Sequence, residues 1–519
     1  MTDIRYPIGI QTFSKIISGR YIYVDKTEIV YRLANKYEYV FLNRPRRFGK
    51  SLLMSTLESY FKGEKELFKD LAIEKLEKDW ISYPVFRFDL SPSNYDDPSK
   101  LIGMIENSLK IIAYDYSLPL EGSDNSVRFI NLIKKAYEKY GQKVVILIDE
   151  YDKPMLDCLH DSDLSEKLKV ELRSFYSVIK ASDRYIKFAM LTGITKFGKI
   201  SVFSGLNNLK DISMMPAFNA ICGISESEFH HTFKDSIESF ADEHEITEEE
   251  AWSKFKTMYD GYHFASRGEG IYNPFSVINA FDENKLKNYW FASGSPSYLI
   301  RLIERNNYRL DSIEGQTRKE DQLNDITDMS EDFVPLLYQS GYLTLKDYYE
   351  ETNEYLLGFP NKEVESSFWG SLASRFFRGI DGNPAFNVRK CLRDINEGRP
   401  EEFMLSMKSL FADTNSETEK DKEIHFQNMM AIAAKMMGLT VRTEVHSAKG
   451  RCDMQILTSS FVYIFEFKID GTPEEAIEQI IEKGYSVPFE ADKRTVFLIG
   501  ANFSTETRTL TDWIINKLH

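Results

Sequence analysis

The sequence has few cysteines, no long apolar run and no surplus of positive charge. Its cysteines are spaced too widely for a Cys-x-x-Cys pair, so a disulfide framework is excluded and a reducing compartment, the cytoplasm, is expected. The four are Cys158, Cys222, Cys391 and Cys452. No apolar stretch approaches the ~18 residues of a membrane-spanning helix. The opening MTDIRYPIGI lacks a basic region followed by an apolar one, so we expect neither a membrane span nor a signal peptide.

The charge balance restricts the partners of the chain. It has 65 lysines and arginines against 80 acids, a formal net charge of −15. This excludes a protein that coats nucleic acid through a general positive field. A nuclease stays possible, because a nuclease site is itself acidic.

Enough apolar material is present for several cores. Hydrophobic residues make up 42% and aromatic residues 13% of the 519 residues. At roughly 100–200 residues per domain, this length predicts two to four domains.

The first two hundred residues alternate apolar strands with helical stretches. The predicted strands cover residues 39–43, 85–90, 144–150 and 186–192. The helices are expected at 50–61, within 97–140, and at about 164–181. Continuous apolar strands separated by helices are typical of a parallel sheet covered on both faces.

A candidate phosphate-binding loop follows the first strand. The segment NRPRRFGKS, residues 43–51, contains Gly49, Lys50 and Ser51, which match the second half of G-x-x-x-x-G-K-[ST] between a strand and a helix. Backbone N–H groups at a helix start favour an anion. Lys50 would reach the β- and γ-phosphates of a nucleotide, and Ser51 would bind Mg²⁺. A chance Gly-Lys-Ser is the alternative.

Two features of this loop are unusual. Arg44 stands where the motif has its first glycine, and Arg46 and Arg47 add local positive charge.

Acidic residues end the third predicted strand. Asp149 is a candidate ligand for Mg²⁺, and Glu150 a candidate for activating the attacking water. Thr192, at the end of the next strand, would sense the γ-phosphate. The alternative for the two acids is an ordinary turn after a strand.

These segments resemble a known family. FLNRPRRFGKSLL, VVILIDEYDKPM, LTGITKFGKISVFSGLNNLKDIS and YDGYHF are similar to the signature blocks of the predicted AAA-ATPase-like family of bacteria, over roughly residues 5–300. The resemblance implies ATP as the nucleotide, an arginine in place of the first glycine, and the Thr192 strand between the other two. It assigns no arginine finger, and Arg173 is only a candidate.

The last hundred residues have a different pattern. A helix is predicted at 422–437, strands at 439–445, 450–457 and 461–469, a helix at 474–483, a strand at 494–500 and a final helix near 506–518. The order is α-β-β-β-α-β-α.

Acidic residues lie on two of these strands. Glu466 and Lys468 share one face of their strand, because side chains alternate, and Asp453 approaches that face if the two strands pair. Two carboxylates hold a divalent cation, and a neighbouring lysine stabilises a phosphate undergoing cleavage. Glu423 would support the metal, and Gln479 would position the substrate or Lys468. The alternative is a pair of solvated acids with a cross-strand lysine.

This segment carries a second resemblance. GRCDM, FVYIFEFK and EEAIEQIIEKGY are similar to the PD-(D/E)XK nuclease superfamily. Asp453, Glu466 and Lys468 match its core motif. Glu423, Gln479 and Tyr485 match the acid of its first helix, the glutamine of its second helix and the tyrosine that follows.

The middle of the chain is less informative. Residues 225–330 read as mostly helical, and 331–360 as a helix with two short strands. This wing-like module would bind DNA or serve as an ATPase lid or spacer. His230 and His231 are expected in structural or surface roles, and His263, within YDGYHF, in a local structural or coupling role.

Together these patterns predict an α/β protein of four parts. They are an AAA-like P-loop ATPase domain at 1–224, a helical lid at 225–330, a wing-like module and helical spacer at 331–415, and a restriction-endonuclease-like domain at 416–519. The leading hypothesis is an ATP-binding protein with a Mg²⁺-dependent nuclease domain, whose nucleotide state gates cleavage of nucleic acid, DNA rather than RNA, with oligomers allowed. The rival hypotheses are an ATP-dependent regulatory switch whose nuclease-like domain only binds or assembles, and an ATPase with no role in nucleic acid.

Overall fold

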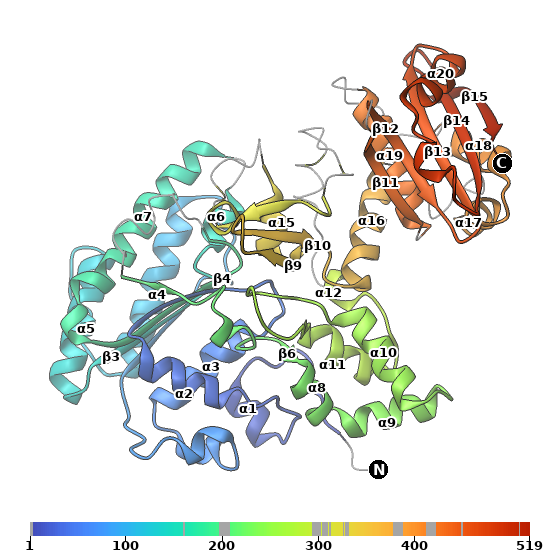
Figure 1. Ribbon diagram of the computed structural model, residues 1–519. Coiled ribbons are helices and arrows are strands. Elements are labelled where there is room, and N and C mark those ends of the chain that lie inside the picture. Colours follow the sequence, from blue (N-terminus) through green and yellow to red (C-terminus); the bar gives the residue numbers. More distant parts are fainter. Residues whose placement is uncertain are drawn as a thin grey trace. The chain divides into compact units, whose positions relative to one another are not determined.

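The computed structural model describes two compact units (Figure 1). One comprises residues 1–293 and 317–364, and the other residues 294–316 and 365–519. The described residues are 4–158, 161–196, 208–292, 303, 310, 313–324, 326, 332–376, 388–411, 422–437, 439–447, 450–507 and 509–518. The predicted boundary near 413–421 lies outside them.

A five-stranded parallel sheet organises the first unit. The strand order is β2-β3-β4-β1-β5, so β4 lies between β1 and β3, as the resemblance implied. The strands are β1 (Tyr39–Asn43), β2 (Val85–Asp89), β3 (Val144–Asp149), β4 (Ile186–Gly193) and β5 (Lys210–Asp211). Every residue of β1 and β3 is buried, because helices cover both faces of the sheet.

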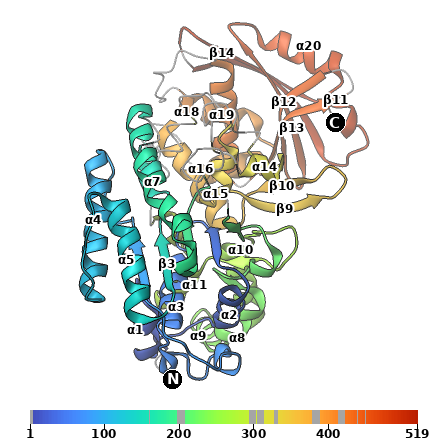
Figure 2. The same cartoon turned by 90° about the vertical axis from the view of Figure 1, so that its left-hand side faces the viewer.

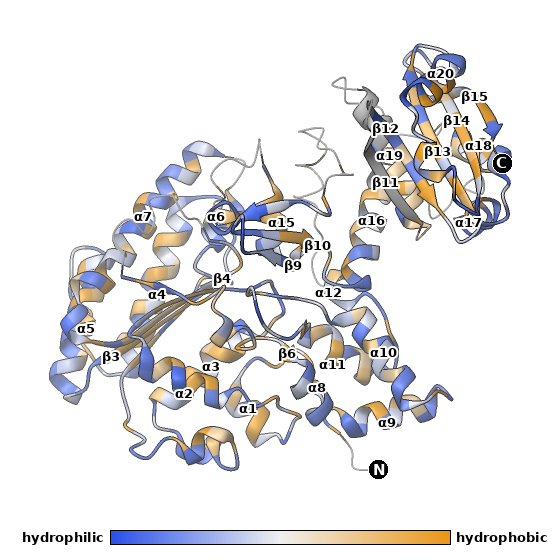
Figure 3. Cartoon of the chain, in the orientation of Figure 1, coloured by the Kyte–Doolittle hydropathy of each residue, from blue (hydrophilic) through white to orange (hydrophobic). Residues whose placement is uncertain are grey.

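Three long helices cover one face and lie side by side (Figure 2). They are α4 (Pro98–Asp115), α5 (Asn125–Tyr140) and α7 (Ser162–Ala181). Helices α5 and α7 carry both hydrophobic and hydrophilic residues along their length (Figure 3), as expected of helices with one face on a sheet and the other in solvent. On the other face, the ring of Phe61 in α3 (Lys50–Phe61) lies 5.1 Å from that of Phe188 in β4. The shorter helices of this region are α1 (Phe13–Ser18), α2 (Thr27–Lys36) and α6 (Lys153–Asp157).

A helical subdomain with an aromatic core follows the sheet. Its core includes Phe229, Phe233, Phe255 and Phe281. Capping boxes at Ser225 and Thr247 start two of its helices, since each side chain satisfies a free N–H group. The helices are α8 (Glu226–Thr232), α9 (Lys234–Glu243), α10 (Glu248–Tyr259), α11 (Pro274–Asp282) and α12 (Tyr289–Ala292). A short pair, β6 (Ile224–Ser225) and β7 (Ile271–Tyr272), joins it to the sheet region.

The predicted helix with two strands is present in the same unit. Helix α15 (Val334–Ser340) precedes strands β9 (Thr344–Tyr349) and β10 (Glu354–Gly358). A third strand that was not predicted, β8 (Thr317–Lys319), completes an antiparallel sheet in the order β8-β10-β9, and α14 (Glu320–Leu323) follows it. We call α15, β8, β9 and β10 the three-stranded module.

The second unit holds a mixed sheet in the order β11-β12-β13-β14-β15. Only β13 and β14 pair in parallel. The strands are β11 (Thr440–Ser447), β12 (Gly450–Leu457), β13 (Phe461–Ile469), β14 (Thr495–Ser504) and β15 (Thr509–Lys517). The helices are α16 (Lys362–Phe376), which begins in the first unit, α17 (Val388–Asn396), α18 (Pro400–Phe411), α19 (Lys422–Met436) and α20 (Pro473–Lys483).

The two faces of this sheet are covered differently. Helix α20 packs its Ile477 and Ile480 against Val462 and Ile464 of β13. On the opposite face, the Tyr463 hydroxyl donates to the carbonyl of Ile395 in α17 at 2.6 Å. The α20 face is therefore the face that carries Glu466 and Lys468.

The predicted final helix near 506–518 is wrong, because this segment forms strand β15. It pairs with β14 from Ser504↔Thr509 to Phe497↔Lys517. Thr509, Thr511, Trp513, Ile514 and Ile515 are residue types that favour strands. The apolar spacing of Leu510, Ile514 and Leu518 suited a helix equally well, and pairing with a long neighbouring strand decided the outcome.

Candidate nucleotide and metal sites

The loop between β1 and α3 presents Lys50 at a helix start. Gly49 precedes the helix with φ of +94°, a left-handed conformation that favours glycine. The buried Lys50 Nζ donates to the carbonyls of Arg44 at 3.1 Å and Pro45 at 3.4 Å. It also lies 3.4 Å from Glu150 Oε1. Ser51 follows in the first turn of α3 and is half-buried.

The three arginines of this loop have different environments. Arg44 is fully buried, and its guanidinium donates to the carbonyls of Asn43, Ser213 and Phe218 at 2.8–3.1 Å. Burial lowers the pKa of Arg44 to about 10. The residue in the position of the missing glycine is therefore a structural support.

The other two arginines stack on aromatic rings. The guanidinium carbon of Arg46 lies 5.2 Å from the ring centroid of Trp290, and that of Arg47 4.9 Å from the ring of Phe275. Arg47 is exposed and Arg46 is half-buried.

The acids and the threonine meet at the carboxyl ends of β3 and β4. The Thr192 hydroxyl donates to Asp149 Oδ1 at 2.7 Å, and the Glu150 N–H group reaches the same oxygen at 3.1 Å. Asp149 Oδ2 is buried and has no hydrogen-bond partner among the described residues. Glu150 has φ of +52°, uncommon for a residue with a side chain. The structure thus brings Lys50, Asp149, Glu150 and Thr192 together.

Two neighbouring residues that the sequence interpretation missed fix this arrangement. Asp152 Oδ2 accepts from the N–H groups of Ile194 at 3.0 Å and Thr195 at 2.6 Å, and from the Thr195 hydroxyl at 2.7 Å. The Tyr151 hydroxyl donates to the Thr195 carbonyl at 2.7 Å. Burial and the charge of Glu150 raise the pKa of Asp152 to about 6. The signal available in the sequence was the second acid of IDEYD.

Arg173, the arginine-finger candidate, lies on α7. After Lys169, its positive charge helps to lower the pKa of Glu166 on the same helix. Its proposed role stays a prediction.

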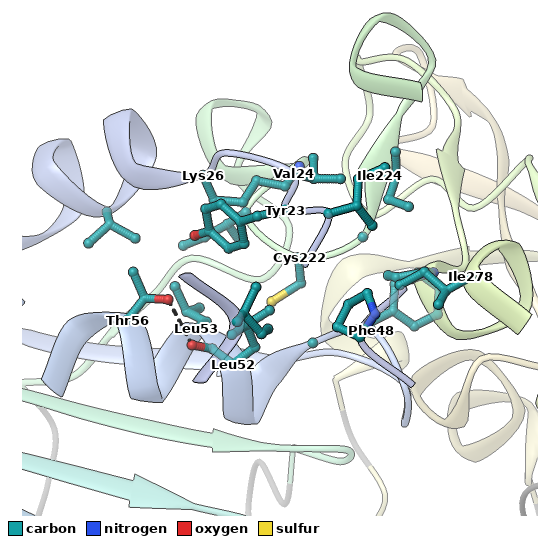
Figure 4. A pocket seen from close by; sticks show the side chains of 18 of the residues that line it. Tyr23, Val24, Lys26, Phe48, Leu52, Leu53, Thr56, Cys222, Ile224 and Ile278 are labelled. Atoms are coloured by element: carbon teal, nitrogen blue, oxygen red, sulfur yellow. Dashed lines mark hydrogen bonds between the residues drawn. The ribbon is translucent and has the colours of Figure 1, made fainter. Parts of the chain in front are cut away.

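An apolar cavity of about 90 Å³ adjoins the phosphate-binding loop (Figure 4). Phe48, Gly49, Leu52 and Leu53 line it from the loop and α3, and the segment 221–224 lines it from the other side. This volume has room for several water molecules.

The few polar groups at this cavity are already engaged. Lys26 forms an ion pair with Glu228, and burial lowers the Lys26 pKa. The Thr56 hydroxyl donates to the Leu52 carbonyl at 2.9 Å. The cavity is therefore suited to an apolar or aromatic group.

The second site lies on the α20 face of the mixed sheet. The Asp453 carboxylate of β12 accepts the N–H group of Phe467 at 2.7 Å. Lys468 Nζ lies 3.8 Å from Glu466 Oε1. Gln479 of α20 joins these two side chains, since it donates to Glu466 Oε1 and accepts from Lys468 Nζ at 2.5 Å.

Glu466 has the environment of a metal ligand. It is 3% exposed, and its Oε2 atom has no hydrogen-bond partner among the described residues. Burial, and then the negative charge of Asp453, raise its pKa to about 8. A divalent cation would compensate both effects.

The remaining predicted residues of this site are only partly described. Glu423 lies on α19, but its side chain is outside the described part of the chain. The buried Tyr485 hydroxyl donates to the Arg451 carbonyl at 2.8 Å. Among the described residues, no group of three or more His, Cys, Asp or Glu side chains is placed to hold a metal.

The histidines have structural surroundings. His230 lies 3.3 Å from Glu226, and its ring contacts that of Trp252 in a tilted arrangement, with centroids 4.0 Å apart. His231 is exposed. The backbone of His263 is bonded to Thr344.

Comparison with known proteins matches one family model to the region of each candidate site. Residues 7–203 match the model of the predicted AAA-ATPase family, and residues 421–513 match that of the PD-(D/E)XK nuclease superfamily. The chain is also 33% identical over 534 residues to the uncharacterized protein in the vnfD 5' region of Azotobacter chroococcum mcd 1, and the alignment covers 100% of each chain. The chain therefore belongs to the predicted AAA-ATPase family, in a form that carries a PD-(D/E)XK nuclease superfamily domain after the ATPase-like region.

Among the helices that the structure describes, none combines the length and the apolarity that crossing a bilayer requires.

Proposed function

We propose that this protein binds ATP with Mg²⁺ in its first unit and cleaves nucleic acid with a divalent metal in its second, and that the nucleotide state gates the cleavage. One observation carries the proposal. Each site holds a buried carboxylate oxygen with no hydrogen-bond partner in the described part of the chain, Asp149 Oδ2 in one and Glu466 Oε2 in the other. A buried carboxylate oxygen in that state is costly, and a cation at each site would remove the cost.

In the first site, different groups would bind the phosphates and the metal ion of a nucleoside triphosphate. The N–H groups at the start of α3 and Lys50 would bind the phosphates, and Ser51 and Asp149 would hold Mg²⁺ with its remaining waters. Binding would move Lys50 from the carbonyls it now contacts to the phosphate oxygens. The apolar cavity beside Gly49 would take the base.

Glu150 and Thr192 would act on the attacking water and the γ-phosphate. The Glu150 carboxylate would accept a proton from the water. The Thr192 hydroxyl, which donates to Asp149, would link the γ-phosphate position to the metal ligand.

In the second site, Asp453 and Glu466 would hold the metal ion, with Glu423 in support. The ion supplies charge neutralisation and an acidified water when it is bound. Lys468 would stabilise the negative charge that develops on the phosphate. Gln479 would hold Lys468 and Glu466 at their present separation.

The rival function is a regulatory switch whose nuclease-like domain only binds or assembles. The observation that favours it is charge. Residues 420–519 carry 12 lysines and arginines against 14 acids, which gives this domain little attraction for phosphates. The β9–β10 hairpin does not supply it, because Lys346 stands there against Asp347, Glu350, Glu351 and Glu354.

We further propose a cytoplasmic location and DNA, ahead of RNA, as the nucleic acid. The cysteines support the location, since Cys158, Cys222, Cys391 and Cys452 are all free and buried. An oligomer is allowed.

A cleavage assay with the full chain tests the function. Single- and double-stranded DNA and RNA are incubated with Mg²⁺ or Mn²⁺, with and without ATP. We expect cleavage that depends on the metal and changes with ATP. Asp453→Ala should abolish cleavage, and Lys468→Ala should slow it while the metal still binds.

A calorimetric titration of Lys50→Ala with ATP supplies the matching control for the first site. We expect no detectable ATP binding by this variant and unchanged metal-dependent cleavage without ATP. Cleavage that persists in Asp453→Ala would contradict the nuclease assignment. ATP affinity that survives in Lys50→Ala would contradict the nucleotide site.

A further inference from the structure

The YDGYHF segment, residues 259–264, packs two aromatic rings against the phosphate-binding loop. Phe48, two residues before Lys50, is 1% exposed. The rings of Tyr262 and Phe264 both meet it edge to face, with centroids 4.7 and 5.4 Å away. Aromatic contacts of this geometry fix the position of a ring as well as burying it.

The same segment also restrains the start of the loop. The guanidinium carbon of Arg44 lies 4.1 Å from the Phe264 ring centroid. The Phe264 N–H group is fixed in turn by Asn219 Oδ1 at 3.1 Å. Arg44, at the start of the loop that precedes Lys50, therefore contacts Phe264. Phe48, near the end of that loop, contacts both Tyr262 and Phe264.

The residue between the two aromatic rings is tied to the three-stranded module. The His263 N–H group donates to the Thr344 hydroxyl at 2.7 Å, and that hydroxyl donates to the His263 carbonyl at 3.0 Å. Thr344 is the first residue of β9 and is 1% exposed. One buried hydroxyl thus satisfies both backbone groups of His263.

The module holds the opposite side of the nucleotide site as well. Gln339 of α15 accepts the Lys196 N–H group at 2.6 Å and donates to the Leu323 carbonyl at 2.5 Å. Lys196 lies four residues after Thr192, in the loop whose N–H groups, at Ile194 and Thr195, donate to Asp152. The three-stranded module therefore contacts the YDGYHF segment through Thr344 and the loop after β4 through Gln339.

We propose that Tyr262, Phe264 and Thr344 are positioning residues for ATP, so that the affinity for the triphosphate is set by a hydroxyl of β9 that does not touch the nucleotide. This inference rests on the proposed function, and it gives the three-stranded module a role in controlling the nucleotide site. In this proposal none of the three side chains would touch the phosphates; each would act through Phe48 and the backbone that leads to Lys50.

The test compares ATP with adenosine, which has the base but no phosphates. Dissociation constants are measured by calorimetry on the full chain. Thr344→Val keeps the shape of the side chain and removes both hydrogen bonds, and Tyr262→Leu removes the ring that contacts Phe48. We expect each variant to bind ATP roughly tenfold more weakly, with little change in the affinity for adenosine.

The conservative variants and a matched control sharpen the result. Thr344→Ser and Tyr262→Phe should restore the affinity for ATP, because Ser keeps the hydroxyl and the Tyr262 hydroxyl has no hydrogen-bond partner among the described residues. Tyr355→Leu makes the same change on β10, where the ring contacts Tyr348, and should leave ATP affinity unchanged.

The outcomes separate this inference from the proposed function. An equal loss for ATP and adenosine would show general damage and would overturn the positioning role. So would unchanged ATP affinity in Thr344→Val and Tyr262→Leu while Lys50→Ala loses binding. Absence of ATP binding by the unmodified chain would overturn the proposed function and the inference with it. If Tyr262→Leu does not fold, Thr344→Val decides the question.

Discussion

At the scale of single residues, Arg44 shows how a departure from a motif becomes part of the structure. A glycine at this position of a phosphate-binding loop leaves space for the phosphates. Arg44 instead turns away from that space and fills a buried slot, where its guanidinium meets three carbonyl oxygens and the Phe264 ring. The loop therefore depends on a side chain that a standard loop lacks.

This environment leads to a prediction for the substitution that restores the usual motif. Arg44→Gly should destabilise the protein by on the order of 3 kcal/mol, since it leaves buried carbonyls without donors and opens a cavity. Urea unfolding of the full chain, followed by tryptophan fluorescence, measures the change in the free energy of unfolding of the first unit. Arg47→Gly is the matched control. Arg47 is exposed with φ of +69°, so this change should stay within about 1 kcal/mol. Equal stability of Arg44→Gly and the unmodified chain would show that Arg44 is dispensable for folding.

Most residues of the two sites could be predicted because their chemistry is local. Gly49 and Lys50 lie at a strand–helix junction, and Glu466 and Lys468 are two residues apart on one strand and so share a face. Spacing alone therefore places them. Asp152 and Tyr151 could not be predicted in the same way. Their partners, Ile194 and Thr195, lie more than forty residues away, and only the pairing of β3 with β4 brings them close.

At the scale of elements, strands of both sheets could be predicted where they are continuously apolar or alternate apolar with polar residues. β1 shows the first pattern and β12 the second, and both occupy the residues expected. Short strands such as β8 could not be predicted, because three residues carry no periodicity and their pairing partner, β10, is distant in sequence. β15 was mistaken for a helix for a related reason, since its partner and not its own pattern decides its conformation.

The strand assignment of β15 predicts an alternation that a helix would not show. Leu518 N–H donates to the Val496 carbonyl at 2.9 Å. Hydrogen-bonded pairs alternate along an antiparallel ladder, so Ile514 donates to β14 and Ile515 directs its N–H group outward. Ile514→Pro should cost about 1–3 kcal/mol through the lost bond and the unpaired carbonyl. Ile515→Pro should cost much less, because an edge strand tolerates proline at such a position. Thermal unfolding compares the two variants, and equal losses would favour a helix.

At the scale of the whole molecule, each of the two candidate sites lies in a unit with its own hydrophobic core. The parallel sheet with its helices has one hydrophobic cluster, and the mixed sheet with α20 has another. A unit with its own core can unfold by itself. A ligand that binds one unit should then stabilise that unit directly, and the other unit only through the energetic coupling that gating requires.

Calorimetric unfolding with each ligand tests this separation. We expect two transitions. ATP with Mg²⁺ at 100 times its dissociation constant should stabilise the first unit by about 2.7 kcal/mol, and Mn²⁺ at the same excess should stabilise the second unit equally. Lys50→Ala should lose every shift that ATP causes, and Asp453→Ala should lose the shift that Mn²⁺ causes in the second unit. These variants are needed because Mg²⁺ can bind at either site, so the variant that loses a shift identifies the site of each ligand. If ATP raised both transitions in the unmodified chain, and Lys50→Ala removed both increases, nucleotide binding would be coupled energetically to the nuclease unit, as gating of cleavage requires.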